Sequence, residues 1–249
     1  MSPRRKIPTV TPLLTPWGAA LDTAHPLPEY PRPQLVRDSY QNLNGRWQYA
    51  ITTTDATPTV FDGDIVVPFS PEALLSGVER QVQPTDVLHY RREFTLAGIV
   101  TPDADERVLL HFGAVDQRAD VWLNDAFLGT HIGGYLPFSF DVTDALDAHE
   151  AHELRVVVHD PSDTTELSRG KQKLKRGGIW YTAQSGIWQT VWLERVPMHR
   201  IDRLSLVPQL RDEAVQVTVH AVNAAVTAST PAFAQEIQKI EQDLKAEEP

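Results

Sequence analysis

Carboxyl groups are the most abundant reactive side chains of this sequence, because 33 of its 249 residues are aspartate or glutamate. General acid–base catalysis needs two carboxyl groups in environments that push their pKa values apart, so that one keeps its proton near neutral pH. Two pairs have a short spacing, Asp116 with Asp120 and Asp160 with Asp163. Carboxylates in turns and at strand ends ordinarily accept hydrogen bonds from backbone N–H groups. We therefore interpret both pairs as structural and predict no catalytic residue.

Metal-ligand side chains come close together at His149, His152 and Glu153. Imidazole and carboxylate groups bind zinc, but this stretch is charged and lies between predicted strands, where a solvated turn is the ordinary structure. We predict no metal site. The chain has no cysteine, so thiolate ligands, thiolate nucleophiles and disulfides are excluded.

The segment 169–178 is basic and flanked by glycine, as phosphate-binding loops are. It lacks the Gly-Lys-Ser/Thr ending of a nucleotide-binding loop. Ser185 lacks the Gly-x-Ser-x-Gly pattern that presents a serine nucleophile. Neither segment predicts phosphate or acyl chemistry, and no cofactor is expected.

The overall charge narrows the classes of partner. A formal net charge of -10 and a pI near 5.3 disfavour binding to nucleic acid or to anionic lipid, because no broad basic surface is available. The basic start of the chain is followed by prolines rather than by an apolar run, and no stretch approaches the roughly 18 to 20 apolar residues of a membrane span. We expect a cytoplasmic location, with neither nucleic acid nor a membrane as partner.

Short apolar runs separated by turns predict a mostly β protein, since 19 prolines and 13 glycines are hard to fit into long helices. Strands are expected at 47–51, 65–67, 90–96, 107–112, 119–123, 127–130, 154–159 and 186–194. Asn124-Asp125 tolerates positive φ and predicts a tight hairpin turn. The last strand is expected to point Ile187, Val191 and Leu193 inward. A β-sandwich over 38–197 follows, preceded by an extended arm over 1–37.

The composition shifts after Pro197. Two further strands are expected at 201–208 and 215–221, too few for an independently stable domain. We interpret 198–221 as the start of a second domain. The tail 222–249 is expected to form at most one short amphipathic helix, with Ile237, Ile240 and Leu244 at helical spacing.

Several blocks occur in an order that is specific to one family. Early blocks are Leu43-Asn-Gly-Arg-Trp47, Val67-Pro-Phe-Ser-Pro-Glu72 and Tyr90-Arg-Arg-Glu-Phe94. Central blocks are Leu110-His-Phe-Gly-Ala-Val-Asp116, Ala119-Asp-Val-Trp-Leu-Asn124, Gly129-Thr-His-Ile-Gly-Gly-Tyr-Leu-Pro-Phe138 and Phe140-Asp-Val-Thr143. Late blocks are Arg169-Gly-Lys-Gln172, Gly178-Ile-Trp-Tyr-Thr182 and Ser185-Gly-Ile-Trp-Gln-Thr-Val-Trp-Leu-Glu194. In this order, over about residues 38–220, they resemble the N-terminal part of family 2 glycoside hydrolases, the β-galactosidase/β-glucuronidase family.

The resemblance implies a galactose-binding-like jelly-roll β-sandwich, followed by the first strands of an incomplete immunoglobulin-like domain. In the family, a (β/α)₈ barrel comes next and holds both catalytic carboxylates. No position of this chain matches either of them. The resemblance therefore implies a carbohydrate-binding and barrel-supporting module that is inactive by itself, while the full-length enzyme hydrolyses O-glycosyl bonds.

Loops of this first domain can approach the barrel mouth in the family, which makes the segment 169–182 a candidate for sugar contact. Arginine and lysine donate to hydroxyls or to a uronate, glutamine donates and accepts, and an aromatic ring covers an apolar sugar face. A mobile loop whose aromatic residues merely pack is the alternative. The expected substrate-binding residues are Tyr135, Arg169, Lys171, Gln172, Trp180 and Tyr181.

The tryptophans in predicted strands are expected to be structural. Alternation places Trp122, Trp188 and Trp192 within strands, so we expect core or interdomain packing for all three. His131 lies beside Gly133-Gly134 in a turn, where a structural and a binding role stay equally open.

Two other functional classes remain. In one, the sandwich is a non-catalytic scaffold that forms a homo-oligomer or pairs with a separate chain supplying the barrel. In the other, the chain is an autonomous enzyme with an unrelated site. The sugar and its linkage are not predicted, because the family's specificity residues lie mostly in the barrel.

Overall fold

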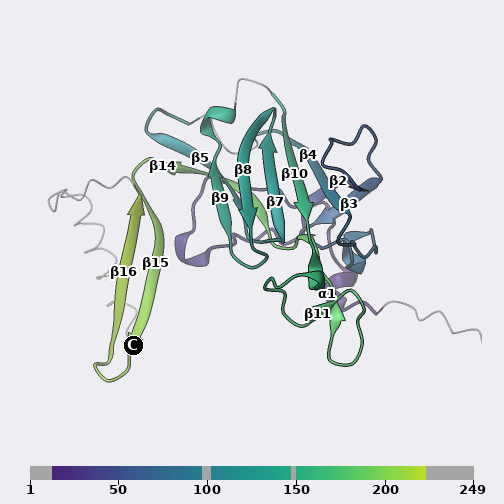
Figure 1. Ribbon diagram of the computed structural model, residues 1–249. Coiled ribbons are helices and arrows are strands. Elements are labelled where there is room, and N and C mark those ends of the chain that lie inside the picture. Colours follow the sequence, from purple (N-terminus) through teal and green to yellow (C-terminus); the bar gives the residue numbers. More distant parts are fainter. Residues whose placement is uncertain (1–12, 97–101, 147–149, 223–249) are drawn as a thin grey trace, which may run out of the picture. The chain divides into compact units, whose positions relative to one another are not determined.

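The computed structural model describes residues 13–96, 102–146 and 150–222 (Figure 1). The chain divides into two compact units, residues 1–196 and 197–249. The expected helix at the tail lies outside the described residues. Among the described residues, no helix is long and apolar enough to cross a membrane.

The first unit is a β-sandwich, as predicted from the sequence. Its strands are β1 (Tyr40–Asn42), β2 (Gly45–Thr52), β3 (Gly63–Val67), β4 (Val87–Phe94), β5 (Glu106–Phe112), β6 (Val115–Asp116), β7 (Arg118–Leu123), β8 (Ala126–Ile132), β9 (Phe138–Asp141), β10 (His152–His159), β11 (Gln172–Lys173), β12 (Tyr181–Thr182), β13 (Gly186–Ile187) and β14 (Val191–Pro197). Its short helices are α1 (Pro16–Ala19), η1 (Pro33–Leu35), η2 (Leu74–Ser76), η3 (Thr143–Ala145) and η4 (Ser162–Thr164).

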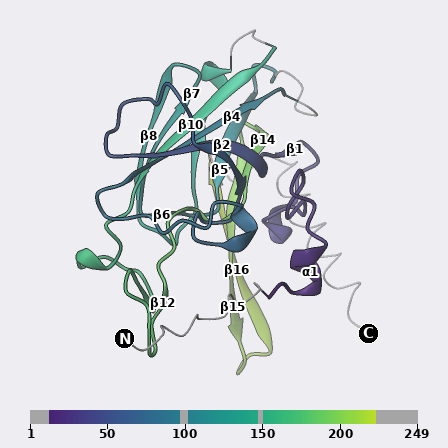
Figure 2. The same ribbon diagram turned by 90° about the vertical axis from the view of Figure 1, so that its right-hand side faces the viewer.

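In the described part of the unit, one sheet has the order β3-β2-β4-β10-β7-β8 and the other β1-β14-β5-β9. Figures 1 and 2 view the larger sheet from two directions. The β7–β8 hairpin turns at Asn124, whose φ of 53° confirms the tight turn predicted there. The loop that bears β11 and β12 leaves the lower end of the sandwich in both views.

The core lies between the two sheets and is built from alternate strand residues. Its largest fully buried side chains include Trp47, Tyr90, Phe112, Leu154 and Leu193. The indole N–H of Trp47 donates to the carbonyl of Leu43 at 2.8 Å, and its ring meets the ring of Tyr90 edge-on at 6.2 Å. The polar atoms of both rings are thus satisfied inside the core, since the Tyr90 hydroxyl accepts a bond from the N–H of Ile187 at 3.2 Å.

The strand predicted over 186–194 is two strands. β13 pairs with β6, whereas β14 lies between β1 and β5. The inward residues were predicted correctly, because Ile187, Val191 and Leu193 are completely buried. The break at residues 188–190 lets the chain change sheets. Gly186, with a φ of 75°, is the first residue of β13.

The tryptophans do not share one environment. Trp192 is buried and stacks on His111 with ring centroids 4.7 Å apart. Trp188 is half-buried and donates to the carbonyl of Gly134 at 2.8 Å. Trp122 lies half-buried on the outer face of the larger sheet, because Val121 and Leu123 take the inward positions. Trp122 is therefore not part of the core, and the interdomain packing that was the alternative for it stays a prediction.

The second unit, as far as the structure describes it, is one antiparallel hairpin of β15 (Arg200–Gln209) and β16 (Ala214–Val222). Large aliphatic side chains of this hairpin are exposed: Leu206, Val207, Leu210, Val215 and Val217. A two-stranded ribbon buries too little apolar area to be stable on its own.

Candidate functional site

The predicted sugar-contact segment lies in the long connection between β10 and β13, residues 160–185. Within this connection, β11 and β12 form a short parallel ladder, in which Gln172 pairs with Tyr181 and Lys173 with Thr182. The turn between them contains Gly177 and Gly178, with φ of 148° and 61°. Since positive φ is cheap for glycine, these two residues allow the loop to close on itself.

Gln172 is the best-anchored of the predicted site residues. Its Nε2 donates to Oδ2 of Asp116 at 3.4 Å, and its Oε1 accepts a bond from the N–H of Gln184 at 2.6 Å. The ring of Tyr135 meets the ring of Trp188 edge-on at 6.1 Å. Burial, followed by the charge of Asp116, raises the pKa of Tyr135, while a hydrogen bond with Gln172 opposes the shift. The structure thus brings Tyr135 and Gln172 to one place.

The other predicted residues lie on the same loop as Gln172. Lys173 holds its ammonium 4.3 Å from the ring centre of Trp180, a cation–π contact that half-buries the indole. Tyr181 is 71% exposed. Lys171 is exposed, and Arg169 folds back to donate to the carbonyl of Thr165 at 2.8 Å.

Three carboxyl groups, of the buried Asp116 and Asp160 and the half-buried Glu72, stand behind this loop, and sequence reasoning did not combine them. Glu72 accepts bonds from the N–H groups of Val82 and Ser185, both at 3.1 Å. Asp160 accepts bonds from the Ser185 hydroxyl and the Ser162 N–H, both at 2.7 Å. These carboxylates therefore hold the loop to the body of the sandwich.

Burial raises the pKa of Glu72 to about 7. Burial, followed by the charge of Asp160, also raises the pKa of Asp116 to about 7. The pKa of Asp160 is raised as well, again mainly by burial. Neighbouring carboxylates in a poorly solvated environment disfavour one another's ionisation. The three carboxyl groups are therefore partly protonated near neutral pH.

One member of each short-spaced carboxyl pair, Asp120 and Asp163, makes local contacts. Asp120 is paired with Arg118 at 3.1 Å on β7, and Asp163 accepts a bond from the N–H of Leu174 at 3.2 Å. Ser185 is buried, and its hydroxyl donates to Oδ2 of Asp160 at 2.7 Å.

The expected absence of a metal concerns a segment that is only partly described. His149 lies outside the described residues, while His152 is buried with its Nδ1 3.3 Å from Nδ2 of Asn124. His131, whose role was left open, stacks on Phe138 with ring centroids 4.1 Å apart.

A polar hollow of about 530 Å³ opens beside the loop. It is lined by Glu72, Glu79, Gln81, Leu174, Lys175, Arg176 and Thr182. Gln81 donates to the carbonyl of Leu174 at 2.9 Å, and Arg176 donates to the Thr182 hydroxyl at 2.8 Å. Gln81 and Arg176 were missed from the sequence because the first lies about 90 residues before the loop and the second stands in a run of similar basic residues.

Residues 67–189 match the family described as glycosyl hydrolase 2 galactose-binding domain-like. Two relatives are each 30% identical: a β-galactosidase of Thermoanaerobacter pseudethanolicus, over 46% of this chain and 15% of the relative, and a β-glucuronidase of Formosa agariphila, over 60% and 14%. The chain thus spans about 15% of the length of these relatives.

Solved structures share the fold. A Ruminococcus gnavus β-glucuronidase is 19% identical with a TM-score of 0.58, covering 76% of this chain and 34% of that one. A Faecalibacterium prausnitzii β-glucuronidase is 24% identical with a TM-score of 0.55, covering 79% and 38%. The match over residues 67–189, together with the ordered blocks, identifies this part of the chain as the galactose-binding-like domain of family 2 glycoside hydrolases.

Proposed function

We propose that this domain contacts carbohydrate through the loop 169–182 and the turn around Tyr135, as a barrel-supporting part of a family 2 glycoside hydrolase. The polar hollow beside that loop is the observation that carries the proposal. It joins hydrogen-bonding side chains to a loop with two aromatic rings, Trp180 and Tyr181, which is the combination that sugar hydroxyls and an apolar sugar face need.

The charge of the loop favours an acidic sugar. The loop residues Arg169, Lys171, Lys173, Lys175 and Arg176 are all basic, whereas the chain as a whole has a net charge of -10. A carboxylate on the sugar would gain charge-assisted hydrogen bonds from such a loop. The β-glucuronidases among the relatives agree with a uronate as ligand.

Hydrolysis of β-galactosides, β-glucuronides or similar compounds belongs, in this proposal, to the full-length enzyme. The 249-residue chain contains no residue that matches the catalytic carboxylates of the family. Purified by itself, it is expected to leave chromogenic β-galactosides, β-glucuronides and β-mannosides intact. Turnover that follows this chain through purification contradicts that part of the proposal.

Sugar contact is tested by titrating glucuronate, galactose and mannose into the ¹⁵N-labelled chain and recording NMR shifts. We expect glucuronate to shift the signals of loop 169–182. The dissociation constant should be in the millimolar range, which corresponds to a binding free energy of about -4 kcal/mol, because half of a site covers little of a ligand. Arg176→Ala and Trp180→Ala should remove the shifts. Arg211→Ala in the β15–β16 turn and Trp17→Ala, at a tryptophan that is 82% exposed, are the matched controls. Shifts that persist in both loop variants refute the proposal.

A second candidate function is interaction with another chain through the β15–β16 hairpin. The exposed aliphatic side chains of that hairpin support it, with Val215 59% and Leu210 90% exposed. Large exposed apolar patches and open strand edges commonly mark an interface. The partner is a second copy or a chain that supplies the barrel. Sedimentation should show self-association that a Val215→Lys/Val217→Lys variant abolishes; a clean monomer at high concentration, with no heterologous partner, rejects it.

A further inference from the structure

The outer face of the larger sheet carries a second hollow, far from the loop 169–182 along the chain. The connection between β2 and β3, residues 53–62, folds over this face. Thr57 accepts a bond from Nη1 of Arg155 at 3.0 Å, and Asp55 pairs with Nε2 of His159 at 2.6 Å. The guanidinium of Arg91 lies 5.2 Å from the ring centre of Phe61. Side chains of β4 and β10 therefore fix the connection in place.

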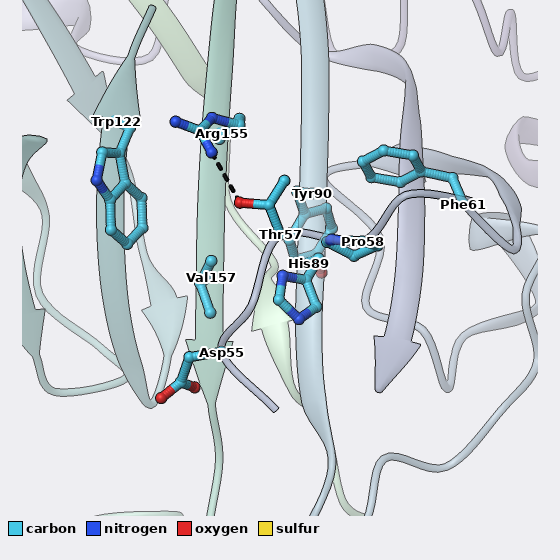
Figure 3. A pocket seen from close by; sticks show the side chains of 9 residues that line it. All are labelled: Asp55, Thr57, Pro58, Phe61, His89, Tyr90, Trp122, Arg155 and Val157. Atoms are coloured by element: carbon cyan, nitrogen blue, oxygen red, sulfur yellow. Dashed lines mark hydrogen bonds between the residues drawn. The ribbon is translucent and has the colours of Figure 1, made fainter. Parts of the chain in front are cut away.

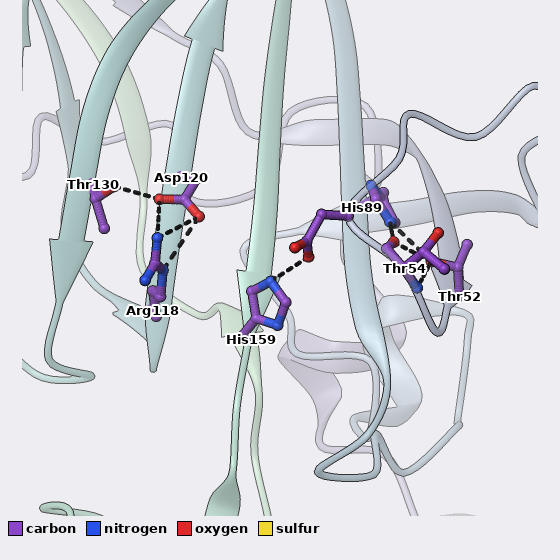
Figure 4. A network of polar contacts seen from close by, with 8 residues as sticks. Thr52, Thr54, His89, Arg118, Asp120, Thr130 and His159 are labelled. Atoms are coloured by element: carbon purple, nitrogen blue, oxygen red, sulfur yellow. Dashed lines mark hydrogen bonds and ion pairs between the residues drawn. The ribbon is translucent and has the colours of Figure 1, made fainter.

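Further polar contacts reinforce this arrangement (Figure 4). Nε2 of His89 lies 3.0 Å from both the Thr52 hydroxyl and the Thr54 carbonyl oxygen. On the other side of His159, Asp120 is held by Arg118 and by the Thr130 hydroxyl. The face is thus a rigid frame with a loop fastened across it, and a binding site on such a frame needs little ordering on association.

Between the connection and β7 lies a hollow of about 150 Å³ (Figure 3). Trp122 lines one side and Pro58 with Phe61 the other, while Arg155, His89 and Asp55 supply polar atoms. Trp122 is supported from behind by Phe127, with ring centroids 5.0 Å apart, and by the guanidinium of Arg155, 5.8 Å from the indole centre. The indole is therefore held in place although it is only half-buried.

From this geometry, the structure assigns to the hollow a binding site for a neutral pyranose unit of a glycan, independent of the site proposed above. One face of a pyranose ring presents C–H groups that an indole covers, and its edge presents hydroxyls that a carboxylate and a guanidinium bind. The carboxylate of Asp55 is 75% exposed and accepts such hydroxyl bonds.

The charges of the lining favour a neutral ligand over an anionic one. Arg155 is paired with Glu153 at 3.2 Å, and Arg91 with the same carboxylate at 3.5 Å. His159 is paired with Asp55. Each of the two guanidinium groups already has a counter-ion, so a uronate or phosphate gains no net attraction here. This distinguishes the hollow from the basic loop 169–182.

The experiment is an NMR titration of the ¹⁵N-labelled full chain with methyl β-D-glucopyranoside and methyl β-D-galactopyranoside. The Trp122 indole N–H is assigned from its loss in Trp122→Phe. We expect this signal and the amides of 55–61 to shift in the millimolar range, and Trp122→Ala and Asp55→Asn each to weaken binding by about tenfold. Asp55 lies in an exposed loop, so its variant keeps the test valid if Trp122→Ala unfolds.

Matched controls are Trp17→Ala and Asp64→Asn, which replace the same residue types at exposed positions outside the hollow. They should bind as the parent chain does. The assignment is overturned if neither glycoside moves the Trp122 signal, if Asp55→Asn binds unchanged, or if the signal moves with protein concentration instead, which indicates that a second copy covers the hollow. Loop variants such as Trp180→Ala should leave these shifts intact, so failure of one site is distinguishable from failure of the other.

Discussion

The hydroxyl of Tyr30 donates to Oε2 of Glu194 at 2.6 Å, across 164 positions of sequence. Arg32 donates to the other carboxylate oxygen, and Nε2 of His111 lies 3.0 Å from it. Glu194 is completely buried in β14. The segment before the first strand is thus attached to the sandwich through the buried carboxyl group of Glu194.

Replacing Glu194 by glutamine should destabilise the fold strongly. Burial alone raises the pKa of Glu194, but hydrogen bonding and charge from His111, then Tyr30 and Arg32, outweigh it and lower this pKa to about 2. Removing one partner of a buried ion pair costs about 3–5 kcal/mol. Denaturant unfolding of Glu194→Gln measures the loss. Glu93→Gln, whose side chain is 66% exposed, is the control and should change stability by about 1 kcal/mol or less.

The same low pKa defines an acid limit. An unfolded glutamate titrates near 4.5 and Glu194 in the fold near 2. Its contribution is complete above pH 4.5 and is lost as the pH falls toward 2, because the unfolded chain then binds the proton first. Between pH 5 and 2, the free energy of unfolding should fall more steeply with decreasing pH in the parent chain than in Glu194→Gln. Equal slopes of free energy against pH contradict the assigned role of Glu194.

The carboxyl groups of Glu72 and Asp116 behind the loop change stability with pH in the opposite direction. The pKa values of Glu72 and Asp116 are raised to about 7 from 4.5 and 3.8. The folded chain therefore holds protons that the unfolded chain has lost, and stability should rise as the pH falls from 8 to about 5. Each group contributes at most about 1.4 kcal/mol per pH unit in that window. In the double variant Glu72→Gln/Asp116→Asn, the midpoint of thermal unfolding should depend less on pH over this range. An unchanged slope of midpoint against pH would show that neither carboxyl group causes the pH dependence.

Gln172 should matter for stability as well as for ligand contact. It satisfies both the buried carboxylate of Asp116 and the N–H of Gln184. Gln172→Ala leaves these groups without a partner, at a cost of about 1–3 kcal/mol. Lys171→Ala, at the exposed neighbouring position, should be neutral. Thermal unfolding of the two variants decides this, and equal midpoints mean that water replaces the glutamine.

Gly186 should tolerate no side chain. A Cβ there would lie 2.1 Å from the Tyr90 hydroxyl, with φ at 75°. Gly178 has a similar φ of 61°, but a Cβ there meets nothing within 4 Å. Gly178→Ala should therefore cost only the backbone strain, about 1–2 kcal/mol, whereas Gly186→Ala adds the clash. Denaturant midpoints of the two variants separate the two effects; similar losses exclude the clash.

The sandwich was predictable because alternation of apolar residues is a local signal. Alternation also gave the inward residues Ile187, Val191 and Leu193. On β7 it points Val121 and Leu123 inward and leaves Trp122 on the outer face. The division of 186–194 into two strands depends on which partner strand each half meets, and no local pattern carries that information.

The candidate site was predictable only in part. The loop was predicted from the family resemblance and from its residue types. Glu72, Asp116 and Asp160 stand on separate segments, and only the fold brings their charges together. Gln172 was expected to serve a ligand, whereas its contacts are with the protein itself. Whether the loop residues also meet sugar stays a prediction.

The placement of these carboxyl groups also orders events during refolding. The three carboxyl groups come from three different strands: Glu72 follows β3, Asp116 ends β6 and Asp160 follows β10. These strands must therefore assemble before the long loop has anything to attach to. Closing connections of such length costs entropy that the loop's few bonds do not offset early. The segment 160–185 should therefore acquire protection from hydrogen exchange last, after the core is complete. A refolding chain should thus complete its hydrophobic interior before the surface formed by residues 160–185.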